Sequence, residues 1–428
     1  MACMAMTDRG RLRLGFWNTA LDGGFVTMQA ITGLIGAYQV LLSVFGLVYR
    51  RKPLQYEPKK RFAVLIAAHN EERVIAPLLQ NLKRLDYPAE LFDVYVIADN
   101  CTDRTAEIAR MHGVYAAERV SDKDRGKGYA MRWMLARLAE SATRYDAVVM
   151  VDADNLVGTN FLRVMNERLL EGKKVIQGYL DIKNPYDSWV SISMAISYWY
   201  TNRMWQLARN NLGLSCALGG TGLCIDMPLL QRLGWEATGL TEDVEFGAKC
   251  VSLGIYPVWA HDAKVYDEKP ITLRASLGQR LRWMQGHFNC AQQYMAPLLG
   301  ASIRERNWAK LDAAIYLFQP MSFLILFFTG FMFLFQASMP ASSAMGAATE
   351  LLPTWFWALV NLFIMLQMPL AMALERTSWK AFIGMPLFPF FMVTWFPVTL
   401  LALFTRNNRV WKHTVHTRAI SIDDLHSR

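Results

Sequence analysis

Residues 25–49 form an uncharged apolar stretch that is long enough to cross the hydrocarbon core of a membrane as a helix. The stretch lacks a small-residue cleavage site and exceeds the apolar core of a usual signal peptide, so it predicts a retained anchor. More basic residues follow it than precede it, namely Arg50, Arg51, Lys52, Lys59, Lys60 and Arg61. The positive-inside bias therefore predicts an N-terminus outside the membrane and a cytosolic location for the chain that follows.

Similar apolar stretches return after Asp312, at residues 313–336, 353–374 and 382–404. The first two contain no charged residue and predict spanning helices. The third is interrupted by Pro386, Pro389 and Pro397. It therefore predicts a broken span, or a re-entrant or interfacial segment. Basic residues that follow it favour a cytosolic C-terminal tail: Arg406, Arg409, Lys412 and Arg418.

Between these stretches, apolar runs of strand length alternate with helical patterns. The runs lie at residues 62–68, 94–98, 147–151 and 175–178. Runs that are apolar at every position are typical of strands covered on both faces, which predicts a parallel sheet. We therefore expect an N-terminal membrane anchor, a Rossmann-like α/β domain, and a C-terminal membrane region with a cytosolic tail, at residues 1–60, 61–300 and 301–428.

Composition narrows the possible partners of the chain. Apolar residues make up 53% of the sequence, which suits a lipid bilayer, and the formal net charge is +9. This charge suits anionic headgroups or a phosphate-bearing substrate. No short block of Lys and Arg dominates, as it does in nucleic-acid-binding arms, so nucleic acid is not an expected partner.

Two acidic residues, Asp152 and Asp154, follow the apolar run at 147–151. Residues two apart in a strand project to the same side, so the two carboxylates are expected to meet at the carboxyl edge of the sheet. One carboxylate and a diphosphate can together hold a divalent metal there, as Mg²⁺ sites commonly do. A loop cap or a chance pair is the alternative interpretation of a bare Asp-x-Asp motif.

Asp99 ends a second apolar run, where its carboxylate could accept a hydrogen bond from a base or a ribose. A turn or helix-capping residue is the alternative. Lys127 lies between Gly126 and Gly128 at the start of a helical pattern and could reach a phosphate. The alternative for this short Gly-Lys-Gly segment is a solvated turn.

Two helix patterns carry further candidates. Thr241-Glu-Asp243 opens an amphipathic helix, where Asp243 is either a general base or one of the acids common in a first helical turn. Gln279, Arg282 and Trp283 share one face of a helix that starts near Leu273. The Arg could hold a departing diphosphate while the indole stacks on a sugar. Snorkelling at a membrane interface is the alternative for that face.

Taken together, these residues resemble the signature of glycosyltransferase family 2, in the membrane-integrated branch of the cellulose, chitin and hyaluronan synthases. The resemblance covers residues 61–299 and is carried, in order, by Ala67-Ala-His-Asn-Glu71, Asp99, Asp152-Ala-Asp154, Thr241-Glu-Asp243 and Gln279-Arg-Leu-Arg-Trp283. It implies a GT-A fold in the α/β domain, with flanking transmembrane and interfacial helices. It also implies an integral protein of a bacterial inner or plasma membrane, with the catalytic domain in the cytosol.

The resemblance implies a role for each position. The nucleotide sugar, UDP-linked in many such enzymes, would be bound by Ala67, Glu71, Asp99, Lys127, Asp152, Gln279 and Arg282. Asp154 would hold Mg²⁺ or Mn²⁺, and Asp243 would be the catalytic base. The glycan or lipid-linked acceptor would be bound by Trp283, Glu242, Gly220 and Thr221.

Two segments depart from the pattern of that branch. The loop at residues 219–222 falls where those synthases carry a short acceptor motif, but it lacks the Cys and the aromatic pair of that motif. Near the C-terminus, Trp411, Thr414 and Arg418 resemble an element that some synthases bring back to the active site, although the spacing to the Arg differs. Residues 186–210, rich in Trp and Tyr, predict an interfacial helix.

The sequence therefore predicts a membrane-embedded inverting β-glycosyltransferase that uses a nucleotide sugar and a divalent metal. A processive polysaccharide synthase, exporting its product through its own helices or with a partner, is the first interpretation. A non-processive transferase acting on a lipid is the second. A transporter is a third, but it predicts ionisable residues inside the spans, and residues 313–336 and 353–374 contain none.

Overall fold

A computed structural model describes residues 8–337, 354–408, 414 and 416–426. Its central element is a mixed eight-stranded sheet with the order β3-β2-β1-β4-β7-β6-β8-β5. The strands are β1 Phe62–Ala68, β2 Phe92–Asp99, β3 Tyr115–Arg119, β4 Ala147–Asp152, β5 Leu156–Val157, β6 Val175–Ile182, β7 Leu223–Asp226 and β8 Val258–Asp267. All four predicted apolar runs are therefore strands. Three of these strands are longer than the run: β2 at both ends, and β4 and β6 at the C-terminal end.

The expectation of a purely parallel sheet was wrong. Strands β1 to β4 run parallel, and β6 runs parallel to β8. However, β7 is antiparallel to both β4 and β6, and β5 is antiparallel to β8. An apolar run reports only that both faces of a strand are covered, and the four residues of β7 are covered whichever way the strand runs.

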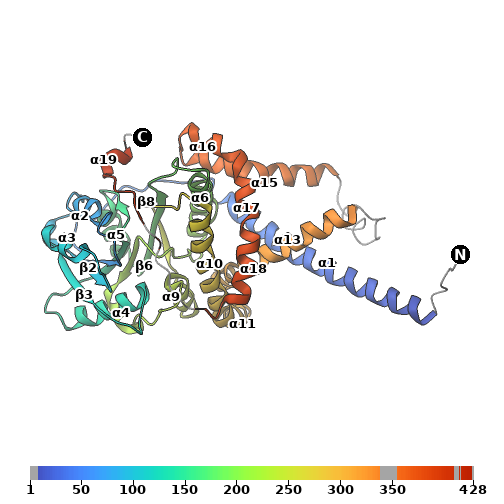
Figure 1. Cartoon of the computed structure of the whole chain (residues 1–428), viewed down its shortest axis with the longest axis horizontal. Coiled ribbons are helices and arrows are strands. Elements are labelled where there is room, and N and C mark those ends of the chain that lie inside the picture. Colours follow the sequence, from blue (N-terminus) through green and yellow to red (C-terminus); the bar gives the residue numbers. More distant parts are fainter. Residues whose placement is uncertain (1–7, 338–353, 409–413, 415, 427–428) are drawn as a thin grey trace.

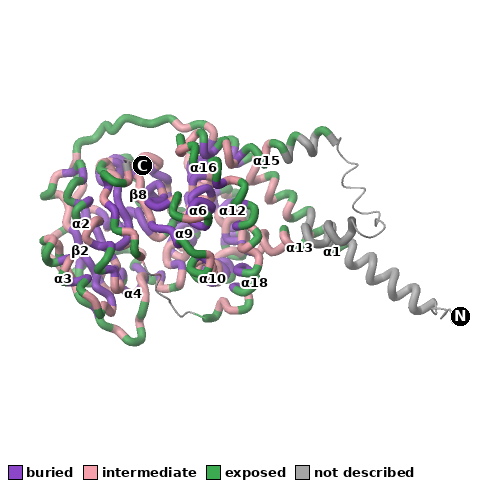
Figure 2. Tube along the Cα trace, turned by 45° about the horizontal axis from the view of Figure 1, so that its top comes forward, coloured by how far each residue is buried: buried purple, intermediate pink, exposed green. Residues whose placement is uncertain are grey.

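Helices cover both faces of the sheet because alternate residues of each strand point to opposite sides. In β1, Phe62, Val64 and Ile66 pack on one side, and Ala63 and Leu65 pack on the other. The first face is covered by α2 Ile75–Leu82, α3 Thr105–Met111 and α5 Phe161–Leu170. The second is covered by α4 Lys127–Glu140, α8 Met227–Leu233 and α9 Glu242–Ser252. These two apolar layers form the core of the α/β domain (Figure 2).

A second group of helices lies beside this domain (Figure 1). One continuous helical run comprises α6 Trp189–Tyr200, the π-helix η2 Thr201–Leu207 and α7 Ala208–Asn211. Another comprises α10 Leu273–Cys290, the π-helix η3 Ala291–Met295 and α11 Ala296–Glu305. The expected interfacial helix at 186–210 corresponds to the first run, which is largely buried against Tyr179, Trp259 and Phe391.

The remaining helices extend away from the domain (Figure 1). They are α1 Asp8–Val44, α13 Gln319–Ala337 and α15 Thr354–Leu374, whereas α12 Trp308–Leu317 packs against α9 and α11. Closer to the domain lie α16 Trp379–Gly384, the 3-10 turn η4 Met385–Leu387, α17 Phe388–Val393 and α18 Trp395–Thr405. A short helix, α19 Ile422–His426, follows the returning C-terminal segment.

Among the described residues, some helical segments are long and apolar enough to cross a membrane. The run Trp379–Thr405 is long and apolar enough to cross, although it is divided among α16, η4, α17 and α18, as its prolines predicted. Trp308–Leu317 and Gln319–Phe328 satisfy the test together, with a bend of 55° between them. Shorter apolar helices lie at Ala30–Val44 and Leu362–Leu374. The predicted three-part division of the chain stays a prediction.

Candidate functional site

One cavity of about 1160 Å³ lies where the carboxyl ends of β1, β2 and β4 meet the helices. The residues that the resemblance assigned to the donor, the acceptor, the metal and the base all line it: Ala67, Glu71, Asp99, Lys127, Asp152, Asp154, Gly220, Thr221, Glu242, Asp243, Gln279, Arg282 and Trp283. The structure thus brings together residues up to about half the chain apart. Their individual roles remain predictions.

The two carboxylates of the Asp-x-Asp motif lie in different environments, which strand alternation did not predict. Asp152 is the last residue of β4 and lies partly exposed in the cavity, whereas Asp154 lies beyond the strand and is buried. The carboxylate of Asp154 accepts hydrogen bonds from the Asn155 side chain and from the backbone N–H of Glu268, both at 3.1 Å. The turn after β4, not the pleat of the strand, therefore positions this carboxylate.

Lys127 links three segments at the floor of the cavity. Its ammonium group contacts the carboxylate of Asp152, donates to the Gly220 carbonyl at 2.6 Å, and lies 3.8 Å from the carboxylate of Glu242. Burial alone would lower the pKa of Lys127, but these neighbouring carboxylates raise it to about 12. A solvated turn does not describe this residue, because it is a permanently charged cation among acids.

Glu242 and Asp243 lie in the first turn of α9, and both line the cavity. Burial raises the pKa of Glu242 to about 7, with a further increase from Asp243 and an opposing effect of Lys127. Burial also raises the pKa of Asp243. Thr241 occupies the N-cap position but makes no side-chain cap hydrogen bond. Acids that only served the helix terminus would gain from full solvent exposure, whereas these acids are only partly exposed.

The loop at residues 219–222 positions Thr221 and Gly220 against both acidic motifs. The Thr221 hydroxyl accepts from the backbone N–H of Asp152 at 3.1 Å and also contacts the side-chain oxygen of Asn155. Gly220 has φ +77°, and a Cβ there would lie 3.5 Å from the carboxylate of Asp243. The glycine therefore lets the backbone turn back close to the proposed base.

Asp99, Glu71 and Ala67 form the opposite rim of the cavity. The Asp99 carboxylate is buried and is paired with the guanidinium of Arg119, while its carbonyl contacts a ring nitrogen of His69 at 2.7 Å. Glu71 is buried, and its carboxylate contacts a ring nitrogen of His416 at 2.9 Å. Arg119 and His416 both belong to the site, and the sequence interpretation did not include them.

His416 belongs to a C-terminal segment that returns to the cavity, as the resemblance predicted for Thr414 and its neighbours. Thr414 and His416 line the cavity, whereas Trp411 lies outside the described residues. The backbone N–H groups of Thr417 and Arg418 donate to the carboxylate of Glu268. Burial would lower the pKa of His416, but Asp154 and Glu71 raise it to about 10. His416 lies between Thr414 and Arg418 of the predicted element, but the sequence interpretation gave this residue no role.

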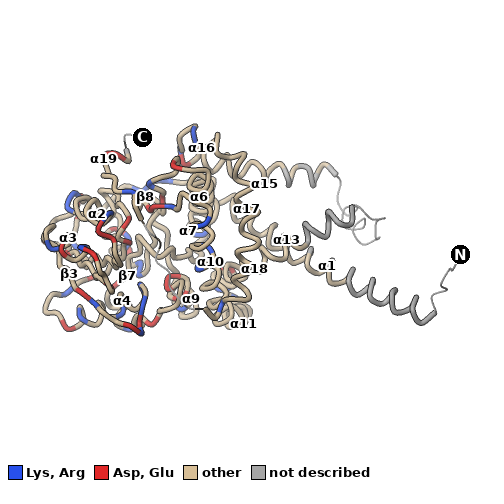
Figure 3. The backbone as a smooth tube through the Cα atoms, viewed as in Figure 1, with Lys and Arg blue, Asp and Glu red and all other residues tan. Residues whose placement is uncertain are grey.

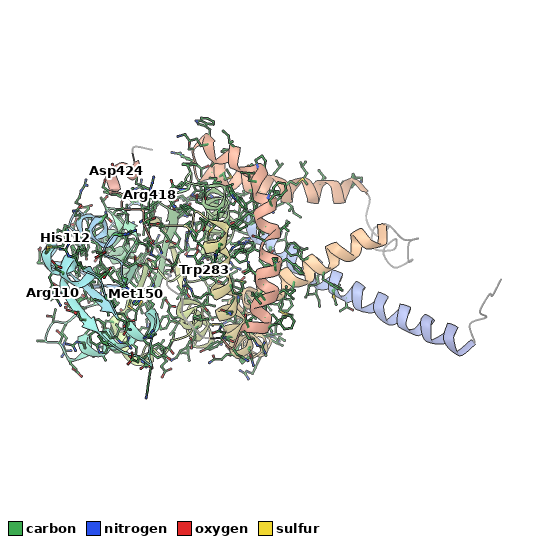
Figure 4. The ribbon with its side chains drawn as sticks, in the orientation of Figure 1. Arg110, His112, Met150, Trp283, Arg418 and Asp424 are labelled. Carbon is green, nitrogen blue, oxygen red and sulfur yellow. The ribbon has the colours of Figure 1, made fainter. Side chains whose placement is uncertain are left out.

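Helix α10 lines one side of the cavity (Figure 4, where Trp283 is labelled). Gln279, Arg282 and Trp283 face the cavity from α10, as their spacing predicted. Beneath the indole, the buried Lys269 ammonium lies 5.6 Å from the ring centroid of Trp283 and 4.1 Å from that of Tyr198. This cation also contacts Asp267. A buried cation thus packs against both aromatic rings, and the sequence interpretation did not include this lysine.

Arg280 on the same helix points away from the cavity and is fully buried. Its guanidinium carbon lies 4.3 Å from the ring centroid of Phe391 and 4.9 Å from that of Trp395. Neither terminal nitrogen has a hydrogen-bond partner among the described residues. Two aromatic rings therefore take the place of an anion for this cation.

No group of three or more His, Cys, Asp or Glu side chains arranged as metal ligands occurs within the described residues. This arrangement is compatible with Mg²⁺ or Mn²⁺, because such ions usually retain waters and bind one or two carboxylates together with substrate phosphates. Asp154 fits that role, since its buried carboxylate accepts only neutral donors from the side chain of Asn155 and the backbone of Glu268. His416 lies close enough to Asp154 for that carboxylate to raise the pKa of the imidazole.

The cavity continues from these charged groups into an apolar arm between the helices. Its lining there comes from α1, α13, α15, α17 and α18, and it includes Ile35, Phe323, Leu326, Ile364, Met368, Met392 and Trp395. Figure 3 shows that the charged residues concentrate on the α/β domain, while the described parts of α13 and α15 carry none. One continuous space therefore joins an ionic site to an apolar surface.

In sequence and in fold, the chain is similar to known glycosyltransferases. A family model described as glycosyltransferase like family 2 matches residues 58–286. A probable glycosyltransferase, YdaM of Bacillus subtilis, is 23% identical over 375 residues, which are 83% of this chain and 85% of that protein.

A β-monoglucosyldiacylglycerol synthase of Nostoc sp. is 27% identical over 295 residues, which are 64% of this chain and 58% of that enzyme. The chain thus spans a little over half the length of that relative. Among solved structures, a mannosyltransferase from Pyrobaculum calidifontis, in complex with GDP-Man and Mn²⁺, covers 82% of this chain and 98% of its own, with a TM-score of 0.53 and 18% identity. This similarity shows a shared fold, which agrees with the expected Rossmann-like GT-A architecture.

Proposed function

Because this chain belongs to glycosyltransferase family 2, and is therefore an enzyme that transfers a sugar from a nucleotide sugar, we propose that it does so with inversion, with a divalent metal, and onto a lipid alcohol at a membrane. The observation that carries this proposal is the continuity of the cavity. It joins Asp154, Asp243 and Trp283 to an apolar arm lined by Phe323 and Met368.

The donor would occupy the end of the cavity at the sheet. Asp99, Glu71 and Ala67 form the rim where the base and ribose bind, and Asp152 and Lys127 lie on the side of the phosphates. Asp154, with His416 nearby, would hold Mg²⁺ or Mn²⁺. The bound metal would neutralise the charge that develops on the leaving diphosphate. Arg282 would contribute a second positive charge from α10, while Gln279 would close the site over the sugar.

The transfer itself would be a single displacement. Asp243 accepts the proton of the acceptor hydroxyl, and the oxygen forms a bond to the anomeric carbon from the face opposite the diphosphate. The bond between that carbon and the diphosphate oxygen breaks, and the nucleotide diphosphate leaves with the electron pair. Burial raises the pKa of Asp243, which makes its carboxylate a better proton acceptor than an exposed one. A β-linkage results from an α-linked donor.

The acceptor end of the cavity favours a lipid. The apolar arm reaches exposed apolar residues on α13 and α15, and the Nostoc relative is named for glucosylating diacylglycerol. The same surface and the basic residues after residue 49 support an integral membrane location with the α/β domain in the cytosol. Trp283 and Glu242 would border the acceptor hydroxyl.

A processive polysaccharide synthase is the second candidate. The observation in its favour is the set of aromatic rings that line the cavity, Trp205 and Tyr198 with Trp283, on which successive sugars could stack. The two candidates differ in product size, because a lipid acceptor receives one sugar whereas a synthase makes a polymer.

The decisive experiment incubates purified protein in detergent with UDP- and GDP-sugars, Mn²⁺ or Mg²⁺, and diacylglycerol. Nucleotide release and product mass are measured for the wild type and for Asp154→Asn. We expect the variant to lose turnover and metal-dependent nucleotide binding together, because an amide lacks the charge that holds the cation.

Asp122→Asn provides the matched control, since this acid is 95% exposed and lies outside the cavity. Undiminished activity of Asp154→Asn at saturating metal would contradict the assignment of the metal site. A product of many sugars per acceptor would replace the lipid proposal with the second candidate.

A further inference from the structure

The cavity has a second opening, remote from the sheet. Two of its lining residues, Leu326 in α13 and Ile364 in α15, are 57% and 50% exposed to the exterior. A residue that lines a cavity and is also exposed marks a place where the cavity reaches the outer surface. The cavity is therefore open between these two helices, on the side opposite the nucleotide-binding rim.

The packing of the helices explains this opening. Helix α13 packs against α1 and α18, whereas α15 packs against α6 and η2. The two helices leave the domain at separate places, α13 beside α1 and α15 beside α16 (Figure 1). The sides of the opening are therefore held by different neighbours.

The chemistry of the apolar arm excludes a charged ligand from this opening. On this side of the cavity the described cationic side chain is Arg209, whose guanidinium is paired with Asp312 at 2.7 Å and 3.1 Å. His287 also lines the cavity, and burial lowers its pKa to about 4, so it is neutral. A lipid phosphate entering here would leave its charge without a counter-charge. A neutral hydrocarbon chain would not.

Size and continuity indicate what fills the arm. The cavity, at about 1160 Å³, exceeds the range of roughly 300–1,000 Å³ that is usual for one small ligand. It therefore has room for a nucleotide sugar and for part of a second substrate. The exposed surfaces of α13, α15 and α17 beside the opening are also apolar, with Phe328, Leu362 and Phe390 among their exposed residues. A hydrocarbon chain could pass from the arm to this surface without meeting a polar barrier.

We propose that the opening between Leu326 and Ile364 admits the acyl chains of a neutral glycerolipid, diacylglycerol, from the side. This inference rests on the proposed function, because it supplies the acceptor of the same reaction. The chains stay in the bilayer while the free hydroxyl reaches Asp243. That hydroxyl loses its proton to Asp243 and forms the bond to the anomeric carbon, and the nucleotide diphosphate leaves. Since the tail enters from the side, the product departs by the same route after one addition.

The test narrows the opening and leaves the site unchanged. Leu326→Trp and Ile364→Trp are compared with Phe328→Trp and Leu362→Trp, which lie on the same two helices with 48% and 52% exposure but do not line the cavity. Each variant is assayed with dioleoylglycerol in mixed micelles, with soluble dibutyrylglycerol, and with no acceptor. We expect the first pair to lower transfer to dioleoylglycerol roughly tenfold, and to affect the soluble diester and donor hydrolysis much less.

The outcomes separate this inference from the proposed function. Equal transfer to dioleoylglycerol by all four variants would overturn the side opening while leaving lipid transfer intact. A wild type that binds and hydrolyses the donor but glycosylates neither diester would overturn the acceptor class alone. A wild type that neither binds nor hydrolyses any donor would overturn the proposed function itself.

A second measurement does not depend on variants and covers the possibility that a Trp substitution impairs folding. A diacylglycerol with a photoreactive group at the end of one acyl chain is irradiated with the wild type, and labelled peptides are identified by mass spectrometry. Labels on α13 and α15 around Leu326 and Ile364, competed by dioleoylglycerol, are the expected result. Labels confined to other helices would overturn the proposal.

Discussion

The two ends of the cavity are built on different principles. At the sheet, the charged side chains described there are tied to one another, as Lys127 is to Asp152 and Asp99 is to Arg119. Between the helices, the lining is mainly apolar, and it is formed by residues such as Phe323 and Met368. The first end holds charges by paired contacts, whereas the second offers shape and hydrophobicity.

This difference separates the chemistry from the choice of acceptor. Hydrogen bonds and ion pairs are directional, so the sheet end can orient a diphosphate and a base. Apolar contacts are non-directional, so the helix end can accept chains of varied length and saturation. We therefore expect substitutions at the sheet end to affect the rate with every acceptor, and substitutions at the helix end to affect one class of acceptor. The predictions that follow test this division.

The largest effect is expected for Asp243→Asn at the sheet end. Transfer should fall by about 10³-fold, because a general base contributes typically 10²–10⁴-fold to the rate. Nucleotide affinity with metal should be retained, since the base contributes little to ground-state binding. The measurements are single-turnover kinetics and nucleotide titration. Glu245→Gln, in the same helical turn but outside the cavity, serves as the control.

Loss of nucleotide binding together with transfer would show that Asp243 acts structurally. Retention of both would assign the base elsewhere. Either result would remove Asp243 from its proposed role as the base, although its carboxylate lies 3.5 Å from a Cβ placed at Gly220.

Trp283 lies between the two ends, and its truncation should affect one substrate more than the other. Trp283→Ala should lower transfer to the acceptor roughly tenfold, because base or sugar stacking on an indole contributes about 1–1.5 kcal/mol. Slow hydrolysis of the donor by water should change little, since hydrolysis needs no stacked acceptor. Nucleotide release and product mass, measured side by side, give the ratio.

Trp308→Ala is the control for Trp283→Ala, because this indole is 75% exposed and lies outside the cavity. A thermal melt of both variants distinguishes loss of stacking from loss of folding. An equal fall in transfer and hydrolysis would place Trp283 in the donor site.

A smaller effect, measured on stability, is expected for Glu242→Gln. Burial raises the pKa of Glu242 from 4.5 to about 7, so the folded state binds its proton more tightly than the unfolded state does. The stability that this carboxyl contributes is present below pH 4.5 and is lost as the pH rises through 7. Without metal or nucleotide, the melting temperature of the wild type should fall over that window relative to Glu242→Gln.

Parallel melting curves for the two proteins from pH 4.5 to 8 would mean that Glu242 is not held out of water. Lys127→Met sharpens the result, because loss of the neighbouring cation should raise the pKa of Glu242 further and move the window to higher pH.

The smallest effect is expected for Arg280→Met, because this buried residue points away from the cavity. The unpartnered terminal nitrogens of this buried guanidinium cost about 1–3 kcal/mol, and stacking on Phe391 and Trp395 returns about 2 kcal/mol. These contributions nearly cancel, so the free energy of unfolding should change by less than about 1 kcal/mol in chemical denaturation. Arg280→Ala should destabilise more because it leaves a cavity.

Arg282→Met, two residues along the same helix, provides the contrast because it faces the cavity. It should abolish most of the turnover and leave stability nearly unchanged. A strong destabilisation by Arg280→Met would show that the guanidinium has a partner beyond the two rings.

Much of the sheet end could be predicted from the sequence. Apolar runs identified β1, β2, β4 and β6, and the residues after three of them do meet in one cavity. The helical spacing of Gln279, Arg282 and Trp283 placed them on one face of a helix that begins at Leu273, as found. These predictions succeed because strand and helix periodicity are local properties.

The remaining features depend on long-range packing. The antiparallel strand β7, the cation under Trp283 and the return of His416 to Glu71 each need contacts between distant segments, and no local pattern encodes them. The position of Asp154 also differs from strand alternation, because the turn after β4 sets it. The apolar arm could not be predicted, since it depends on how several helices are arranged around it.

The contact between Glu71 and His416 has a consequence for the timing of activity. These residues are 345 positions apart, so the ribosome completes the second long after the first strand could fold. Until residues 416–418 have been made and have docked on Glu268, His416 is absent from the rim of the cavity. A nascent chain would therefore complete this part of the site only when its synthesis is almost finished.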